Sequence, residues 1–140
     1  MLNTIEMASW NNLRVLNPTN PPKYVISRKK EVQDRYNSHV KYLKSINKST
    51  GDYIMETFVK DKDYHLCLNT FPYNCEDGIE HWLLWINPNT NIKLAHVEQI
   101  LNKNFKKFVF FRNILELQSV KSIVHYHVFV KEHNNNIHKL

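Results

Sequence analysis

Glycine is scarce in this chain of 140 residues, where it occurs only as Gly51 and Gly78. Phosphate-binding loops of the Walker or dinucleotide type need closely spaced glycines, because only glycine lets the backbone close on phosphate oxygens. The G-x-S-x-G nucleophile elbow needs two neighbouring glycines as well. The sequence therefore excludes all three kinds of site.

Cysteine is equally scarce, and long apolar runs are missing. Cys67 and Cys75 are too few for a disulfide framework and lack the C-x-x-C spacing of a zinc ribbon. No stretch approaches the roughly eighteen consecutive apolar residues of a membrane span. Residues 1–15 include Glu6 and other polar residues where a signal peptide needs an apolar segment. We therefore expect a protein of the reducing cytoplasm that has no membrane partner.

The charge balance is basic. Lys and Arg number 19 against 13 Asp and Glu, which gives a net charge of +6 at pH 7. This balance fits an anionic partner, such as a nucleotide or another anionic small molecule. Nucleic acid is less favoured, since the densest basic patch, Lys23 with Arg28–Lys30, is typical of the solvated start of a helix. The sequence does not set the oligomeric state.

Hydrophobic periodicity predicts an α+β fold with one domain at residues 25–131, an N-terminal arm at 1–24 and a polar tail at 132–140. Apolar residues at three- and four-residue spacing predict two main helices, and alternating or doubly apolar runs predict strands. The helices are expected over 27–47 and 94–105, with a short one near Trp10, and the strands over 64–68, 79–86, 108–112 and 120–130. Residues 53–60 fit either a helix or a strand. We expect an antiparallel sheet with the helices on one side.

The last strand carries an H-x-H motif, His125 and His127. Side chains alternate between the two faces of a strand. One face is therefore an apolar surface for the core, and its members are Val124, Tyr126, Val128 and Val130. The two imidazoles share the other face, roughly 7 Å apart. Such a pair can line a partly wet sheet face, bind an anion or catalyse, or contribute to a metal site.

Several ordered motifs resemble a family of small fungal and large-DNA-virus proteins, whose fungal members are named N-acetylglucosamine-induced proteins. The resemblance runs from about Trp10 to Lys131, and its motifs lie at residues 36–43, 69–73, 78–85 and 121–128. The family name reports a context of expression and implies no activity. For a viral member, the expected location is the cytoplasm of the host.

The same order of segments resembles, more distantly, the histidine-triad (HIT-like) nucleotide hydrolases and transferases. In those enzymes a strand carries H-φ-H-φ-H, and the middle histidine attacks an α-phosphate. The resemblance makes His125 the first histidine and His127 the catalytic nucleophile, and it puts Phe129 at the third position. Residues 80–88 resemble the strand T-H-φ-L-V-I-P-K, which implies a ligand-binding role for His81. Because Phe129 lacks a polar group, nucleotidyl transfer is favoured over hydrolysis.

Cationic and amide groups near the motif are the expected ligand-binding donors. They would offset charge on phosphate oxygens from the last two strands and their connection. These candidates are Arg112, Asn113, Lys121 and Ser122.

The sequence thus favours a HIT-like nucleotide- or phosphoester-binding domain with weak nucleotidyl transferase or hydrolase activity. One alternative is a catalytically silent binding or adaptor module that has lost the triad. Another is an H-x-H metal-binding protein, although spacing assigns no third ligand beside the two histidines. No metal and no cofactor is expected.

Overall fold

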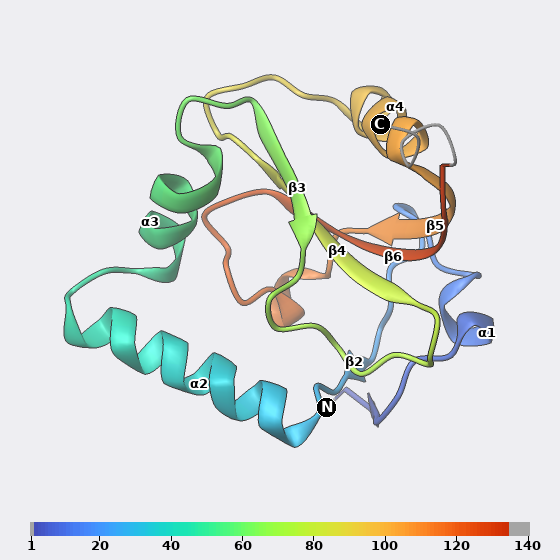
Figure 1. Ribbon diagram of the computed structural model, residues 1–140, viewed down its shortest axis with the longest axis horizontal. Helices are drawn as coiled ribbons and strands as arrows, with labels where there is room; N and C mark the ends of the chain where they lie inside the picture. The colour runs from blue at the N-terminus through green and yellow to red at the C-terminus, as the bar shows by residue number, and fades with distance from the viewer. Residues whose placement is uncertain (1, 135–140) are drawn as a thin grey trace.

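The computed structural model describes residues 2–134, and its centre is a four-stranded antiparallel sheet (Figure 1). The strand order is β3-β4-β6-β5, formed by β3 (Tyr64–Leu68), β4 (Glu80–Ile86), β6 (His125–His133) and β5 (Phe105–Phe111). A separate two-stranded parallel sheet joins β1 (Thr4–Ile5) to β2 (Val25–Ile26). The predicted single α+β domain with an antiparallel sheet is confirmed.

The helices are α1 (Trp10–Leu13), α2 (Lys30–Ser45), α3 (Thr50–Ile54), the π-helix η1 (Met55–Val59), α4 (Leu94–Asn104) and the 3-10 turn η2 (Leu115–Leu117). The ambiguous residues 53–60 are therefore helical. Helix α2 begins later than predicted because Ser27 continues the pairing of β2, where its N–H donates to the Ile5 carbonyl (2.9 Å). Across residues 2–134, no helix has the length and apolar character that crossing a bilayer requires.

The two faces of the sheet carry different helices, so the expectation of helices on one side is wrong. Leu84 and Ile86 of β4 pack against α4, together with Val128 and Val130 of β6. Leu83 and Trp85 point to the other face and pack against Ile54 of α3 and Val59 of η1. Strands β4 and β6 are central and buried on both faces, so each face needs its own cover.

The N-terminal segment packs on the sheet instead of extending from it. Ala8, Leu13 and Leu16 are buried in one cluster with Phe111 of β5 and Phe129 of β6. This cluster covers the part of the histidine-bearing face that α3 and η1 leave open. At the other end of the chain β6 continues to His133, and of the predicted polar tail, residues 135–140 lie outside the described residues.

The register of β4 and β6 places the predicted H-x-H strand correctly, with one difference. His127 lies opposite Leu83, and His125 lies opposite Trp85. Val128 and Val130 are buried as predicted, but the strand begins at His125, and Val124 is 38% exposed. The prediction that Val124 belongs to the core is therefore wrong, because the alternation of faces starts only where the strand does.

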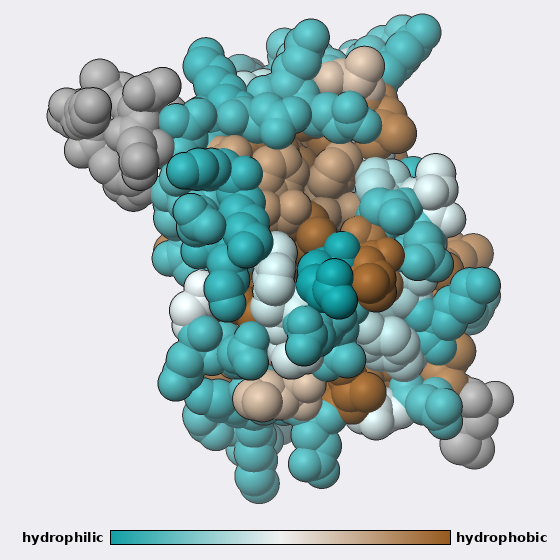
Figure 2. All heavy atoms as spheres, turned by 90° about the vertical axis from the view of Figure 1, so that its right-hand side faces the viewer, coloured by the Kyte–Doolittle hydropathy of each residue, from teal (hydrophilic) through white to brown (hydrophobic). Residues whose placement is uncertain are grey.

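Strand β5 is an edge of the sheet, and charged side chains protect it. Lys106 and Lys107 are exposed at an irregularity in its pairing with β6. On the side of the molecule where β5 and α1 lie, polar side chains cover most of the surface, and apolar atoms emerge mainly in one central area (Figure 2). Exposed lysines at an irregular edge disfavour pairing with the strand of another molecule.

Phe129 anchors the N-terminal segment to the sheet, since its side chain is fully buried and stacks on His81 with ring centroids 4.4 Å apart. We expect Phe129→Ala to lower the free energy of unfolding by about 3–5 kcal/mol, because truncation leaves a cavity. Urea denaturation measures this change. Leu115→Ala is the matched control: Leu115 is 62% exposed, and we expect a change within about 0.5 kcal/mol. Equal losses for the two variants would contradict the packing described here.

Candidate functional site

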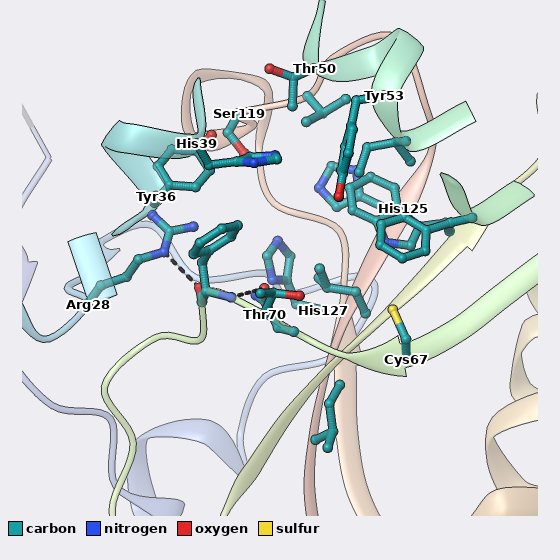
Figure 3. Close-up of a pocket in the computed structure, with 18 residues that line it drawn as sticks. Arg28, Tyr36, His39, Thr50, Tyr53, Cys67, Thr70, Ser119, His125 and His127 are labelled. Carbon is teal, nitrogen blue, oxygen red and sulfur yellow. Dashed lines mark hydrogen bonds between the residues drawn. The ribbon is translucent and has the colours of Figure 1, made fainter. Parts of the chain in front are cut away.

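A cavity of about 190 Å³ lies between the histidine-bearing face of the sheet and the helices that cover it (Figure 3). Its lining is rich in aromatic rings, contains no carboxylate from residues 2–134, and includes Tyr36 and His39 of α2, Tyr53 of α3, Phe58 of η1, Phe71 and Trp85. We call it the aromatic cavity. It is larger than the cavity of about 150 Å³ that holds benzene and smaller than the roughly 300 Å³ of a drug-sized site. It therefore has room for one ring or a group of similar size.

Two buried histidines from neighbouring strands are in direct contact beside this cavity. Nε2 of His81 on β4 lies 2.8 Å from Nδ1 of His127 on β6. The backbone N–H of Tyr73 donates to Nδ1 of His81 (3.0 Å), and the Asn69 amide lies 3.5 Å from the same nitrogen. At the other end, the side-chain amide of Asn113 lies 3.1 Å from Nε2 of His127 and 3.0 Å from the Tyr73 hydroxyl.

These contacts determine where the protons lie. Nδ1 of His81 accepts from the backbone N–H of Tyr73, so a neutral His81 carries its proton on Nε2 and donates to His127. His127 then accepts at Nδ1 and carries its own proton on Nε2. The side chain of Asn113 must accept a hydrogen bond from that N–H, so its amide oxygen, and not its NH₂ group, faces His127. A 180° rotation of the terminal amide gives this orientation. Both nitrogens of His127 are thus engaged within the protein.

His125 differs from His127 in this respect. Its Nδ1–H donates to the backbone carbonyl of Ile123 at 3.0 Å, which leaves the lone pair on Nε2. His125 lines the aromatic cavity, and Nε2 has no hydrogen-bond partner among the described residues. The buried indole N–H of Trp85 makes no hydrogen bond of normal geometry within residues 2–134, and the indole interacts with the Cys67 thiol. Its ring centroid lies 4.6 Å from that of His125, so the two rings lie side by side at one end of the cavity.

Burial makes all three imidazoles neutral at pH 7. It lowers the pKa of His81 to about 3, and the charge of Arg28 adds to the effect. Burial also holds the pKa of His127 well below its usual value, with smaller effects from His81, His125 and Arg28. The pKa of His125 is lowered by burial and by Arg112, against the opposing hydrogen bond to Ile123. A neutral imidazole can act as a nucleophile or base, but it supplies no charge to bind an anion.

Arg28 provides the positive charge. Its guanidinium carbon lies 4.5 Å from the ring centre of Tyr36 and 5.3 Å from that of Tyr73, and Nε donates to the Phe71 carbonyl (2.8 Å). Figure 3 shows Arg28 at the opposite end of the aromatic cavity from His125. No carboxylate in residues 2–134 forms an ion pair with Arg28. The cation is therefore held in place by aromatic rings and left without a counter-charge.

A family model described as a protein of unknown function (DUF3605) matches residues 9–131. The chain belongs to the DUF3605 family. N-acetylglucosamine-induced protein 1 of Candida albicans is 29% identical over an alignment of 94 residues, and the match covers 54% of this chain and 37% of that protein. This relative confirms the resemblance that the sequence motifs indicated. The chain spans little more than a third of the length of the curated relative it matches.

A solved structure, the crystal structure of HTC1, shares the fold of this DUF3605 chain. Its TM-score is 0.54, with 23% identity, and the match covers 75% of each chain. At this level of identity the likeness concerns the fold alone.

The structure brings together four of the predicted site residues of this DUF3605 member and separates three. His81, His125, His127 and Asn113 meet at or beside the aromatic cavity. The other three, Arg112, Lys121 and Ser122, are exposed and do not line it. Arg112 acts on His125 only through its charge, Lys121 donates to the Gln118 carbonyl (3.1 Å), and Ser122 lies against Gly51 of α3.

Sequence reasoning missed Arg28 and the aromatic residues of α2 and α3. Arg28 was assigned to a solvated helix start, because its partner Tyr73 lies far away in sequence. The spacing of Tyr36 and His39 on one face of α2 was the signal available. Within residues 2–134, no group of three or more His, Cys, Asp or Glu side chains is arranged to hold a metal ion.

The proton positions can be observed directly. Long-range ¹H–¹⁵N correlation spectra distinguish the two neutral tautomers of each histidine. We expect His81 and His127 to carry their protons on Nε2 and His125 to carry its proton on Nδ1, for the reasons given above. A proton on Nδ1 of His127 would contradict the assigned direction of the network.

The buried histidines also predict how stability depends on pH. In the unfolded chain an imidazole has a pKa of about 6.5 and is protonated below that pH. In the folded protein the pKa of His81 is about 3, so His81 stays neutral down to about that pH. The unfolded state binds more protons in this window, so stability should fall as the pH falls from 6.5 toward 3. The slope approaches about 1.4 kcal/mol per pH unit for each such histidine. Urea midpoints at several pH values measure it.

Proposed function

We propose that this chain is a HIT-like domain that binds a nucleotide or another phosphoester in the aromatic cavity. It transfers the phosphorus-containing group of that ligand through His125. The observation that carries the proposal is the open lone pair on Nε2 of His125, fixed by the hydrogen bond of Nδ1–H to the Ile123 carbonyl. This nitrogen lies in a cavity that has an unpaired cation at its other end. A neutral imidazole held in this way is an activated nucleophile.

The lining of the cavity favours a planar and anionic ligand. Tyr53, Phe58 and Trp85 offer ring faces on which a base can stack, and such stacking tolerates different bases. The lack of carboxylates in the described lining disfavours a cationic ligand, while Arg28 attracts an anionic one. The volume suits one ring, so the remainder of a nucleotide would extend toward the opening.

The proposed chemistry has two steps. Nε2 of His125 attacks phosphorus with its lone pair, a P–N bond forms, and the P–O bond to the leaving group breaks, with the electron pair going to the departing oxygen. Nδ1–H remains on the Ile123 carbonyl and stabilises the imidazolium that results. Water or an acceptor hydroxyl then attacks phosphorus, its proton passes to solvent, and the P–N electron pair returns to Nε2. The indole N–H of Trp85 is available to a phosphoryl oxygen.

The motif-based assignment made His127 the nucleophile, and the hydrogen bonds favour His125 instead. His127 has no free lone pair, because Nδ1 accepts from His81 and Nε2–H donates to Asn113. We assign His127 and His81 as positioning residues. They hold β4 and β6 in the register that presents His125.

The decisive variant is His125→Asn. We expect cleavage of the p-nitrophenyl ester of thymidine 5′-phosphate to fall at least about 100-fold, because Asn has no nucleophilic nitrogen. Mass spectrometry of the intact wild-type protein should detect a nucleotidyl adduct, and His125→Asn should form none. Calorimetry should still detect AMP binding within a few-fold of wild type, since Arg28 and the rings remain. His96→Asn on α4 is the control and should leave turnover unchanged.

Two other outcomes have definite meanings. AMP binding without turnover or adduct in the wild-type protein would favour the alternative function, a binding module that keeps the cavity and lacks the chemistry. Full turnover in His125→Asn would contradict the proposed role of this residue.

A further inference from the structure

A second cavity, of about 300 Å³, shares Arg28 with the aromatic cavity and has no part in the chemistry proposed above. Its walls come from β2 and the residues around it, the start of α2, Tyr73 and the segment after β5. Its lining includes Ser27, Arg28, Asn113 and Leu117. Among the described residues, no Asp or Glu lines this cavity, which we call the second cavity.

Asn113 lines the second cavity and has a hydrogen-bond donor to spare. The side chain is only 6% exposed. The proton positions assigned to the two histidines require its amide oxygen to accept from Nε2–H of His127 and from the Tyr73 hydroxyl. The NH₂ group then occupies the opposite end of the amide, to which no described group is hydrogen-bonded. A buried amide donor without a partner is costly unless a ligand or water accepts from it. Since Asn113 lines the second cavity, an acceptor there would satisfy it.

Arg28 adds an uncompensated charge to the same space. Nε donates to the Phe71 carbonyl and Nη1 lies 3.5 Å from Oε1 of Gln33, so both of its described acceptors are neutral. Its charge reaches the interior, where it lowers the pKa of His81 and of His127. A half-buried guanidinium without a carboxylate favours an oxyanion, which accepts from it in a charge-assisted hydrogen bond.

We propose that the second cavity is a phosphate site, in which Arg28 and the NH₂ group of Asn113 bind the oxyanion and the Ser27 hydroxyl lies within the same wall. The phosphate is either free inorganic phosphate or the phosphate end of a ligand whose ring fills the aromatic cavity. The proposal does not rest on the chemistry assigned to His125, because none of the three groups makes or breaks a bond in it, and Arg28 serves the aromatic cavity only by attracting an anionic ligand.

Titration of ¹⁵N-labelled protein with inorganic phosphate tests the site. We expect saturable shifts of the Asn113 side-chain NH₂ and of the backbone amides of Ser27 and Leu117. Leu117→Trp should fill the second cavity and weaken phosphate binding at least tenfold. The matched control, Leu68→Trp, places the same ring at the 54%-exposed Leu68 of the aromatic cavity and should change the affinity less than twofold.

Asn113→Asp tests the amide itself. The carboxylate keeps an oxygen on His127 and Tyr73, removes the NH₂ donor and adds a negative charge that repels phosphate, so phosphate binding should fall at least tenfold. The Asn113→Gln variant guards against misfolding, because it keeps an NH₂ donor. If both variants fold and Asn113→Gln retains more phosphate affinity than Asn113→Asp, the result supports the site. Equal phosphate affinity in folded Asn113→Asp and wild-type protein would overturn it.

AMP binding by Leu117→Trp identifies the source of the phosphate. Phosphate binding by His125→Asn separates this proposal from the catalytic one. If Leu117→Trp weakens AMP binding as much as phosphate binding, the second cavity holds the phosphate of the nucleotide away from His125, which supports the site and contradicts the catalytic proposal. If AMP binding is unchanged, the second cavity holds free phosphate, which supports the site and leaves the catalytic proposal standing. Phosphate-induced chemical-shift changes that are confined to the Trp85 indole and that Leu68→Trp abolishes would overturn the proposed site. His125→Asn should leave phosphate affinity unchanged, so failure of the catalytic proposal is visible separately.

Discussion

The hydrogen bond between His81 and His127 is the contact on which the rest of the site depends. Two imidazoles 2.8 Å apart in the interior cannot both be charged, since burial and mutual repulsion disfavour the protonated form of each. Their contact is diagonal across β4 and β6, because His81 pairs with Phe129 and His127 pairs with Leu83. A slip of one residue would turn one of the two imidazoles to the face that α4 covers. The contact therefore ties the register of the central strands to the chemistry of the cavity.

The same pair also organises the loops around it. The segment before β4 is held by the Tyr73 N–H on His81, and the segment after β5 is held by Asn113 on His127. Because a backbone N–H can only donate, it sets the direction of every proton along the chain of contacts. A buried network in which each member is satisfied contributes rigidity and a unique arrangement. His125 stays outside this network, and that is why its Nε2 remains available.

The sequence predicted the elements well and the site only in part. Periods of two and of three to four residues located β3, β4, α2 and α4, and the H-x-H motif correctly placed His125 and His127 on one face. Helices on both faces were not predicted, although Ile79–Ile86 was already interpreted as a strand apolar on both faces. The role of Arg28 could not be predicted, because it depends on Tyr73 and Phe71, which pack beside it only in the folded chain. Periodicity tells which face a residue occupies, and it does not tell which distant loop covers that face.

Under the proposed function, the hydrogen bonds also shift how β6 aligns with the H-φ-H-φ-H pattern. The position without a histidine is then the first one and not the third. If His125 is the middle histidine, then His127 is the third and Ile123 occupies the first position. Ile123 is 3% exposed and belongs to the apolar cluster that attaches α3 and η1 to the sheet. Phe129, by contrast, stacks on His81 and Phe111 and lines none of the cavity. An isoleucine at the first position thus helps to secure the helices over the cavity, while the nucleophile and the histidine that supports its strand are both retained. Loss of a first histidine removes a possible ligand contact and leaves the attacking nitrogen in place, so on this assignment two histidines suffice for transfer.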